Sequence, residues 1–494
     1  MLLPRLRQGR TTGQGGPTRE SSTELVKGLG LLDAVMLIVG SMIGSGIFIV
    51  SAEIARVVAS PGLLLLIWLL SGVMTVLAAL SYGELSAALP HAGGQYVFLR
   101  EAYGPMCGFL YGWTLFLVIQ SGTIAAVAVA FARYLDVFLP LSRQLFAIEL
   151  LGRHQAFDLK QLVGVAVIGL LSLVNCFGIR VGANVQNAFT ALKVLALVLL
   201  VGAGIAYTGG SWNHFRPFLP DQAGVHLIVQ QYQRNSAPLL GSGSLVWEYG
   251  LLIGVAMIGA LFASDAWNNL TFTGGEVRNP QRNLPLALFL GTGLVTLLYV
   301  LCNVAYLHVL PIPQISQTDK IAASVARTIL GSTGNALISF AILISTFGCL
   351  NGLILSGPRV YYAMARDHLF FKTVAKIHPR YHTPVKSLGV QAFWASLLTL
   401  SGTYSQLLTY VISAALLFYI LTVYGLIRLR KTQPNLSRPY KAIGYPFLPW
   451  LYVMMAAAVL ASNLIGDPSN SWPGFAIIAI GLPAYFYWKR KYAI

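Results

Sequence analysis

Apolar stretches of about twenty residues recur along this chain, and each is long enough to cross a lipid bilayer as a helix. A chain with 56% hydrophobic and only 10% charged residues would expose a large apolar surface as a soluble fold. The sequence therefore predicts an all-α integral membrane protein. Its twelve predicted transmembrane spans are residues 31–55, 63–88, 107–135, 161–178, 185–208, 246–274, 285–310, 333–358, 386–402, 406–428, 446–465 and 473–488.

The basic residues predict the orientation of these spans. Most of the 33 lysines and arginines fall in the N-terminal segment or in the short loops and tail that share its side of the membrane. Because such basic loops stay in the cytoplasm, both termini are expected there, with the protein in the plasma membrane. Residues 1–27 lack the apolar core of a signal peptide and are expected to form a disordered tail. The formal charge of +17 follows from this topology, and no folded domain is left to bind nucleic acid.

Two predicted spans are interrupted at their middle. The first contains "VGSMIGSGIFIV", residues 39–50, and the sixth contains "IGALFASDAWNN", residues 258–269. The interrupted spans are five apart, so they cross the membrane in opposite directions, and the two halves of the chain are related by inversion. The expected divisions are a first repeat at 28–208, an external loop at 209–245, a second repeat at 246–430, and two final spans at 431–494.

An unwound helix frees backbone groups that cost several kcal/mol each in lipid unless a partner satisfies them. A zwitterion satisfies both kinds. The half-helix that starts near Gly46 presents free amides and a positive dipole end, which suit a carboxylate. Small residues such as Gly40 and Gly44 also let helices pack closely without a ligand, but the matching break in the sixth span favours binding. The carbonyls expected to face an ammonium group are those around Met42, Ile43, Phe262 and Ala263.

Two charged residues are predicted at membrane depth. Lys193 lies roughly 12 Å from the inner end of the fifth span, too deep to reach water easily. We expect it to bridge the broken first span to the eighth, through Ser345, at the place where a sodium ion would otherwise be held; a purely structural lock is the alternative. Asp265 could hydrogen-bond the opened helix, contact a cationic substrate or accept a proton, and the first, structural role is favoured. It is also counted among the residues that face the substrate's amino group.

At these residues the chain resembles the L-type amino acid transporters of the amino acid-polyamine-organocation superfamily. The matching motifs are "GSMIGSGIF" (Gly40 to Phe48), "GGQYVFLREAYGP" (Gly93 to Pro105), "NVQNAFTALK" (Asn184 to Lys193), "FASDAWNNLTF" (Phe262 to Phe272), "GEVRNPQRNLPLA" (Gly275 to Ala287) and "STFGCLNG" (Ser345 to Gly352).

The resemblance implies a 5+5 inverted-repeat fold with discontinuous first and sixth helices. It implies sodium-independent transport of L-amino acids, commonly by exchange, with Phe262 as an aromatic gate and Lys193 at the vacated ion position. The unwound sixth span would bind the α-amino group. The residues implied to bind the α-carboxylate lie between Ser41 and Gly46, with Gly44 and Ser45 among them. Ser264 departs from the motif and leaves the side-chain preference open.

Animal members of the family that pair with a heavy chain use a cysteine in the loop after the third span. The corresponding loop, "LSRQLFAIELLGRHQAFDLKQ", has none, which indicates a stand-alone and bacterial member without a disulfide-linked partner. No cofactor or metal site is expected, since the sequence has no metal-ligand spacing such as CxxC or HExxH. An embedded enzyme would need a catalytic pair at depth and a channel a continuous polar stripe, and the sequence favours neither. A proton-coupled amino acid symporter stays open beside exchange.

Overall fold

The computed structural model describes residues 25–492 except 143, 151–152, 236–243 and 402–403. Most of the predicted tail at residues 1–27 therefore lies outside the described residues. The first five membrane spans are built from α1 (Leu31–Met42), η1 (Gly46–Phe48) and α2 (Val50–Val58); α3 (Pro61–Ala88); α5 (Pro105–Thr114), η2 (Leu115–Ile119) and α6 (Gln120–Leu135); α7 (Leu159–Cys176); and α8 (Ile179–Ala206).

The next five spans repeat this organisation, and two further helices follow them. They are α10 (Leu245–Ala263) and α11 (Asn269–Phe272); α12 (Pro280–Val309); α15 (Ser332–Ser356) and α16 (Pro358–Arg366); α17 (Val385–Leu400); α18 (Tyr404–Thr432); α19 (Phe447–Gly466); and α20 (Pro468–Tyr492). The connections hold α4 (Gln95–Tyr103), η3 (Trp212–Phe215), α9 (Gln222–Asn235), η4 (Gly274–Glu276), α13 (Ile312–Gln317), α14 (Ile321–Leu330) and η5 (Lys372–Ala375).

The twelve spans match the predicted ones. In the described residues, nine helical segments are long and apolar enough to cross a membrane, and the broken α1–α2 pair, α17 and α20 complete the set. Several helices begin with a proline, which already has helical φ and lacks the amide that would be left unpaired there. These first residues are Pro61, Pro105, Pro280 and Pro358.

The all-α class is confirmed for the membrane spans, and one short element of another kind lies between two of them. The loop after α6 contains an antiparallel hairpin of β1 (Gln144–Leu150) and β2 (Arg153–Asp158), paired from Gln144 with Asp158 to Leu150 with Arg153. Strands outside the bilayer need no apolar run of membrane length, so a search for such runs does not detect them.

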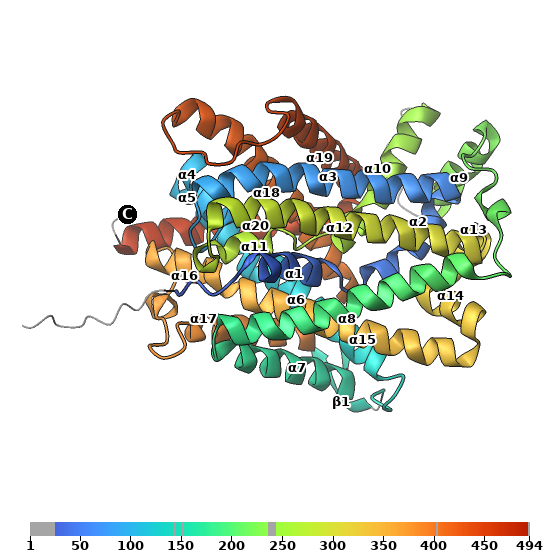
Figure 1. The fold of residues 1–494 in the computed structure, drawn as a ribbon, viewed down its shortest axis with the longest axis horizontal. Helices are drawn as coiled ribbons and strands as arrows, with labels where there is room; N and C mark the ends of the chain where they lie inside the picture. Colours follow the sequence, from blue (N-terminus) through green and yellow to red (C-terminus); the bar gives the residue numbers. More distant parts are fainter. Residues whose placement is uncertain (1–24, 143, 151–152, 236–243, 402–403, 493–494) are drawn as a thin grey trace, which may run out of the picture.

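The spans form one elongated bundle (Figure 1), in which α3, α8 and α12 run side by side along the long axis. The last turn of α20 lies at the same end of the bundle as α4 and α16, whereas β1, α9 and α13 lie at the opposite end (Figure 1). The first described residues also lie at the end with α4. There the segment before α1 pairs with the segment after α11, because Gly28 N and Leu29 N both donate to Glu276 O, at 2.9 and 3.0 Å.

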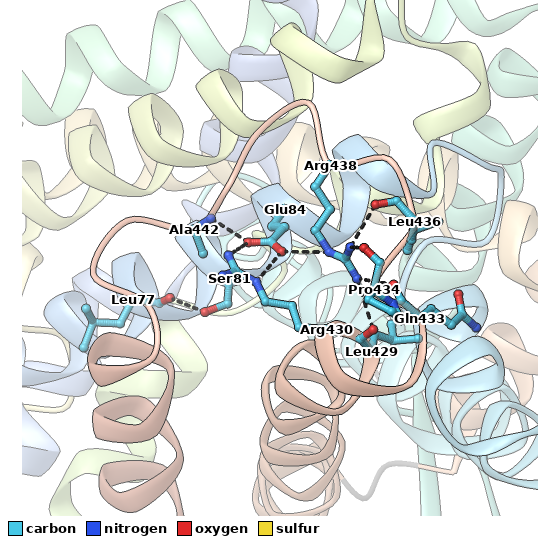
Figure 2. A network of polar contacts seen from close by, with 10 residues as sticks. All are labelled: Leu77, Ser81, Glu84, Leu429, Arg430, Gln433, Pro434, Leu436, Arg438 and Ala442. Carbon is cyan, nitrogen blue, oxygen red and sulfur yellow. Dashed lines mark hydrogen bonds and ion pairs between the residues drawn. The ribbon is translucent and has the colours of Figure 1, made fainter.

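Buried ion pairs hold the same end together. The Glu84 carboxylate of α3 accepts hydrogen bonds from Arg430 of α18, at 2.8 Å from Nε, and from the amide of Ala442, at 2.7 Å; Arg438 Nε lies 3.4 Å from it (Figure 2). Figure 2 also shows that Arg438 contacts backbone carbonyls of the last turn of α18 and of the segment that follows it. Glu84 is only 1% exposed, so its charge depends on these partners.

Two further carboxylates lie at this end. Glu276, after α11, forms a two-pronged pair with Arg359 of α16, at 2.7 and 3.0 Å, and both residues are buried. Asp367 accepts from the Tyr96 hydroxyl at 2.7 Å and from Arg100, both on α4. Burial first, and the Asp367 carboxylate second, raise the pKa of the Tyr96 hydroxyl, so it remains a donor.

Candidate functional site

The first helix is interrupted where its glycines and serines predicted. Regular α1 ends at Met42, and Ile43 has extended backbone angles, φ −76° and ψ 95°. The chain then turns through residues 43–45 into η1 and α2. In the described part of the chain, the amides of residues 44–47 donate no hydrogen bond, whereas those of Phe48 and Ile49 close the first turn. Successive free amides at the start of a half-helix form a binding place for an anion.

Lys193 of α8 lies against this break. Its ammonium donates to Gly40 O and Ile43 O, both at 2.8 Å, and to Ser345 O of α15 at 2.9 Å. Lys193 is 1% exposed, and three acceptors match the three protons that an ammonium carries. The Ser345 hydroxyl adds contacts to Ile43 O at 3.1 Å and Gly44 O at 2.9 Å. Three carbonyls at the first break, those of Gly40, Ile43 and Gly44, are thereby satisfied by side chains from α8 and α15.

The second break begins where α10 ends at Ala263, and helix resumes only at Asn269. Within it, Ala266 has a positive φ of 67°, a conformation that side chains with a Cβ seldom adopt. The carboxylate of Asp265 accepts a hydrogen bond from the Tyr419 hydroxyl of α18 at 2.5 Å. Asn268 donates to Gln95 of α4 at 2.8 Å, so the break is tied to the α4 end of the bundle.

The two breaks touch each other. A Cβ added to Gly46 would lie 2.6 Å from the Ala263 Cβ, closer than carbon atoms pack, so only glycine allows this approach. The hydroxyl of Tyr299, on α12, lies 3.1 Å from Met42 O and 3.0 Å from Ala263 O and shares its single proton between the two carbonyls. One side chain therefore joins both unwound segments.

Two small hollows lie beside the second break, with volumes of about 10 and 20 Å³. Asp265 and Tyr419 line both of them. Each has room for about one water molecule, so the breaks are packed closely in this conformation. A π-helical turn, η2, contributes Leu115 and Ile119 to the first hollow, and such turns occur often at functional sites.

The structure brings most of the predicted residues together. Residues 41–46 meet Lys193, Ser345 and Ala263 at the contact of the two breaks. Phe262 is partly buried against the core and lines neither hollow, so its role as a gate stays a prediction. Tyr299 and Tyr419 were not predicted, because a tyrosine in a membrane span gives no signal that separates a site residue from a packing one.

A bundle of membrane-spanning helices with two broken helices facing each other at mid-depth defines a secondary membrane transporter. A model of the amino acid permease family matches residues 29–483. The chain therefore belongs to that family, within the amino acid-polyamine-organocation superfamily, and it is a transporter rather than an enzyme. Its fold is the twelve-span, 5+5 inverted repeat that the sequence predicted.

The similarity to three named amino acid transporters extends over nearly the whole chain. The human large neutral amino acids transporter small subunit 2 is 32% identical over 97% of this chain and 83% of its own length. The serine/threonine exchanger SteT of Bacillus subtilis (strain 168) is 31% identical over 95% of this chain and 98% of its own length. The human cystine/glutamate transporter is 29% identical over 97% of this chain and 89% of its own length.

Proposed function

We propose that this protein exchanges L-amino acids across the plasma membrane, without sodium, by alternating access. The proposal rests on two features that occur together at the first break. The amides of residues 44–47 donate no hydrogen bond to any described residue, and the Lys193 ammonium donates one to each of three carbonyls. Amides bind the carboxylate of an amino acid, and a fixed positive charge removes the need for a metal cation. That one relative is named an exchanger supports exchange over one-way transport.

The α-carboxylate is bound at the first break. Ser41, Gly44, Ser45 and Gly46 surround it, with the free amides as donors. The hydroxyl of Ser41 is buried and has no hydrogen-bond partner in the described chain, so it is available as a further donor. A carboxylate that receives several such hydrogen bonds loses little free energy when it leaves water for the site.

The α-amino group is bound between the two breaks. Its acceptors are the carbonyls of Met42, Ile43, Phe262 and Ala263, together with the carboxylate of Asp265. Tyr299, Lys193 or Ser345 already donates to three of these carbonyls. A carbonyl oxygen accepts two hydrogen bonds, so an ammonium can add to those present. Phe262 then closes over the bound molecule and excludes water.

Lys193 and Ser345 form the sodium substitute. The ammonium supports the opened carbonyls of α1 and connects them to α15, which are contacts that a bound cation would make. Because Lys193 is part of the chain, the first break keeps its positive charge whether or not sodium is present. The transport cycle is therefore independent of a sodium gradient.

In the cell, both termini are cytoplasmic and the repeats comprise residues 28–208 and 246–430. The protein works in the lipid bilayer without a disulfide-linked heavy chain, because the loop between α6 and α7 has no cysteine in its sequence. No nucleic acid, metal or cofactor takes part.

Purified protein in liposomes tests the proposal. Unlabelled amino acid inside the vesicles should accelerate uptake of labelled amino acid about tenfold or more over empty vesicles, since exchange returns the loaded carrier faster than the empty one. Replacing external sodium by choline should leave the rate unchanged. Uptake that requires sodium, or that is indifferent to internal amino acid, would contradict sodium-independent exchange.

Proton-coupled symport is the second candidate. It is favoured by the position of Asp265, whose carboxylate lines both hollows and could carry a proton through the cycle. The same vesicles separate the two mechanisms. An inward proton gradient should drive accumulation into empty vesicles if protons are coupled, and should have no effect on exchange between loaded ones otherwise.

A further inference from the structure

The hollow of about 10 Å³ beside the second break has a mixed wall. Its apolar part is formed by Leu115, Ile119, Ala266, Leu353 and Ala415. The polar part consists of seven side chains, from α5, α6, α18, the second break and the start of α11: Tyr111, Gln120, Thr123, Asp265, Asn268, Asn269 and Tyr419. A wall of this kind, apolar with a few converging polar groups, is typical of a small-molecule subsite.

The hollow adjoins the first break. Ala266 lines it and packs in one cluster with Cys349 of α15. The Cys349 sulfur in turn lies 3.0 Å from Ser41 O and 3.3 Å from the position that a Cβ on Gly44 would take. An amino acid held at the two breaks therefore has this hollow within reach of its side chain.

Two polar groups in the wall have unused bonding capacity. The amide nitrogen of Asn269 is buried, with the residue 2% exposed, and donates to nothing in the described chain. The Asp265 carboxylate accepts hydrogen bonds from the Tyr419 hydroxyl and from the backbone amide of Ala266, whereas a carboxylate can accept about four. A buried donor without an acceptor is unfavourable, so a ligand that satisfies it binds more tightly than one that does not.

The charge and the hydrogen-bonding groups of the wall disfavour acidic, apolar and basic side chains. Among the described residues, those that line the hollow include no lysine, arginine or histidine, so an acidic side chain would meet Asp265 without a counter-charge. A branched aliphatic or aromatic side chain would displace water and leave Asn269 and Asp265 unsatisfied. A lysine or arginine side chain could pair with Asp265, but it is much larger than a hollow of about 10 Å³ and, offering donors only, would leave the Asn269 amide unpaired.

We infer that this hollow receives the side chain of the transported amino acid and selects small, uncharged side chains that both donate and accept hydrogen bonds. This inference rests on the proposed amino acid exchange. A hydroxyl or carboxamide, as in serine, threonine or asparagine, donates to Asp265 and accepts from Asn269. Gln95 is a positioning residue, because its side chain bonds Asn268 at 2.8 Å and Thr422 of α18 at 3.1 Å.

The first experiment is a panel of internal amino acids in vesicles that hold the full-length protein. Labelled serine outside, with serine, threonine or asparagine inside, should exchange about tenfold faster than with leucine, phenylalanine, lysine or glutamate inside. Faster exchange with any of the latter four overturns the selectivity, while the proposed exchange stands. If no internal amino acid stimulates uptake, the proposed function itself fails.

The second experiment tests the donor. Asn269→Leu should lower the ratio of serine to leucine exchange about tenfold, since the lost donor disfavours a hydroxyl and the new surface favours an alkyl group. Asn303→Leu is the matched control: Asn303 is also a buried asparagine with one unpaired amide atom, but it lies on α12 outside the hollow, and the ratio should not change. An unchanged ratio in Asn269→Leu overturns the inference. If that variant does not fold, the panel on the unaltered protein decides.

Discussion

The hydroxyl of Tyr299 lies 3.0 Å from the carbonyl of Ala263, at the last residue of α10, and reaches the last carbonyl of α1 at 3.1 Å. Both carbonyls are orphaned because their helices stop there, and one hydroxyl supplies the partner that the bilayer cannot. Tyr299 belongs to α12, which packs against α1, α3 and α8. The two unwound segments are thereby fixed to a helix outside both of them.

Tyr299→Phe should slow amino acid exchange in vesicles about tenfold, because losing a buried hydrogen-bond partner costs about 1–3 kcal/mol. The aromatic ring and its packing against Trp68 are kept, so the change acts through the hydroxyl alone. Tyr103→Phe provides the control. Its hydroxyl also donates to a backbone carbonyl, Leu421 O at 2.7 Å, but away from the breaks. Equal rates for the two variants would show that bridging the breaks does not matter for transport.

Lys193→Ala should abolish exchange while the protein remains folded and monodisperse in detergent. The three carbonyls that the ammonium binds lose their donor, and α1 loses its connection to α15 through the ammonium. Lys160→Ala, at a partly exposed ion pair 3.5 Å from Asp136, should transport normally. Normal exchange by Lys193→Ala would remove any transport role from this residue and leave a structural lock.

Much of the fold was predictable because the bilayer restricts the chain to long apolar helices. Both breaks were predictable too. Three glycines in seven residues at 40–46, and an aspartate at 265 in an apolar span, are costly in a regular membrane helix and so indicate interruption. Lys193 was predictable for the same reason, since a charge at that depth requires acceptors.

The partners of these residues were not predictable. Glu84 and Arg430 are separated by 346 positions in the chain, and nothing local to either names the other. Tyr299 and Asn269 become significant only once the rotation of α12 and the path of residues 264–268 are known. The hairpin of β1 and β2 was missed because it lies outside the apolar runs on which the prediction depended.

Gly46→Ala should reduce exchange at least about tenfold, because the added methyl group would overlap both the Cβ and the Cα of Ala263, at 2.6 and 3.0 Å, and force the two breaks apart. Gly202→Ala on α8 makes the same change where no atom lies within 4 Å of the new carbon. The control should transport normally and gain slightly in stability from the better helix propensity of alanine. Undiminished exchange by Gly46→Ala would show that the close contact of the breaks is dispensable.

Glu84→Gln should lower thermal stability more than any single surface ion pair does. The carboxylate is 1% exposed and receives hydrogen bonds from Arg430 and from the amide of Ala442. These two bonds join α3 to α18 and to the segment before α19. Removing one partner of such a buried pair costs about 3–5 kcal/mol, because the arginine is left without its counter-charge. The melting temperature in detergent, followed by tryptophan fluorescence, measures this loss.

Asp319→Asn is the reference for that measurement. Asp319 pairs with Arg56 at the opposite end of the bundle, where its side chain is 88% exposed, and exposed pairs contribute about 1 kcal/mol at most. Its melting temperature should stay close to that of the unaltered protein, whereas that of Glu84→Gln should fall by several degrees. If the two variants melt together, the network of Glu84, Arg430 and Arg438 does not hold this end of the bundle closed, and the adjoining helix packing must do so alone.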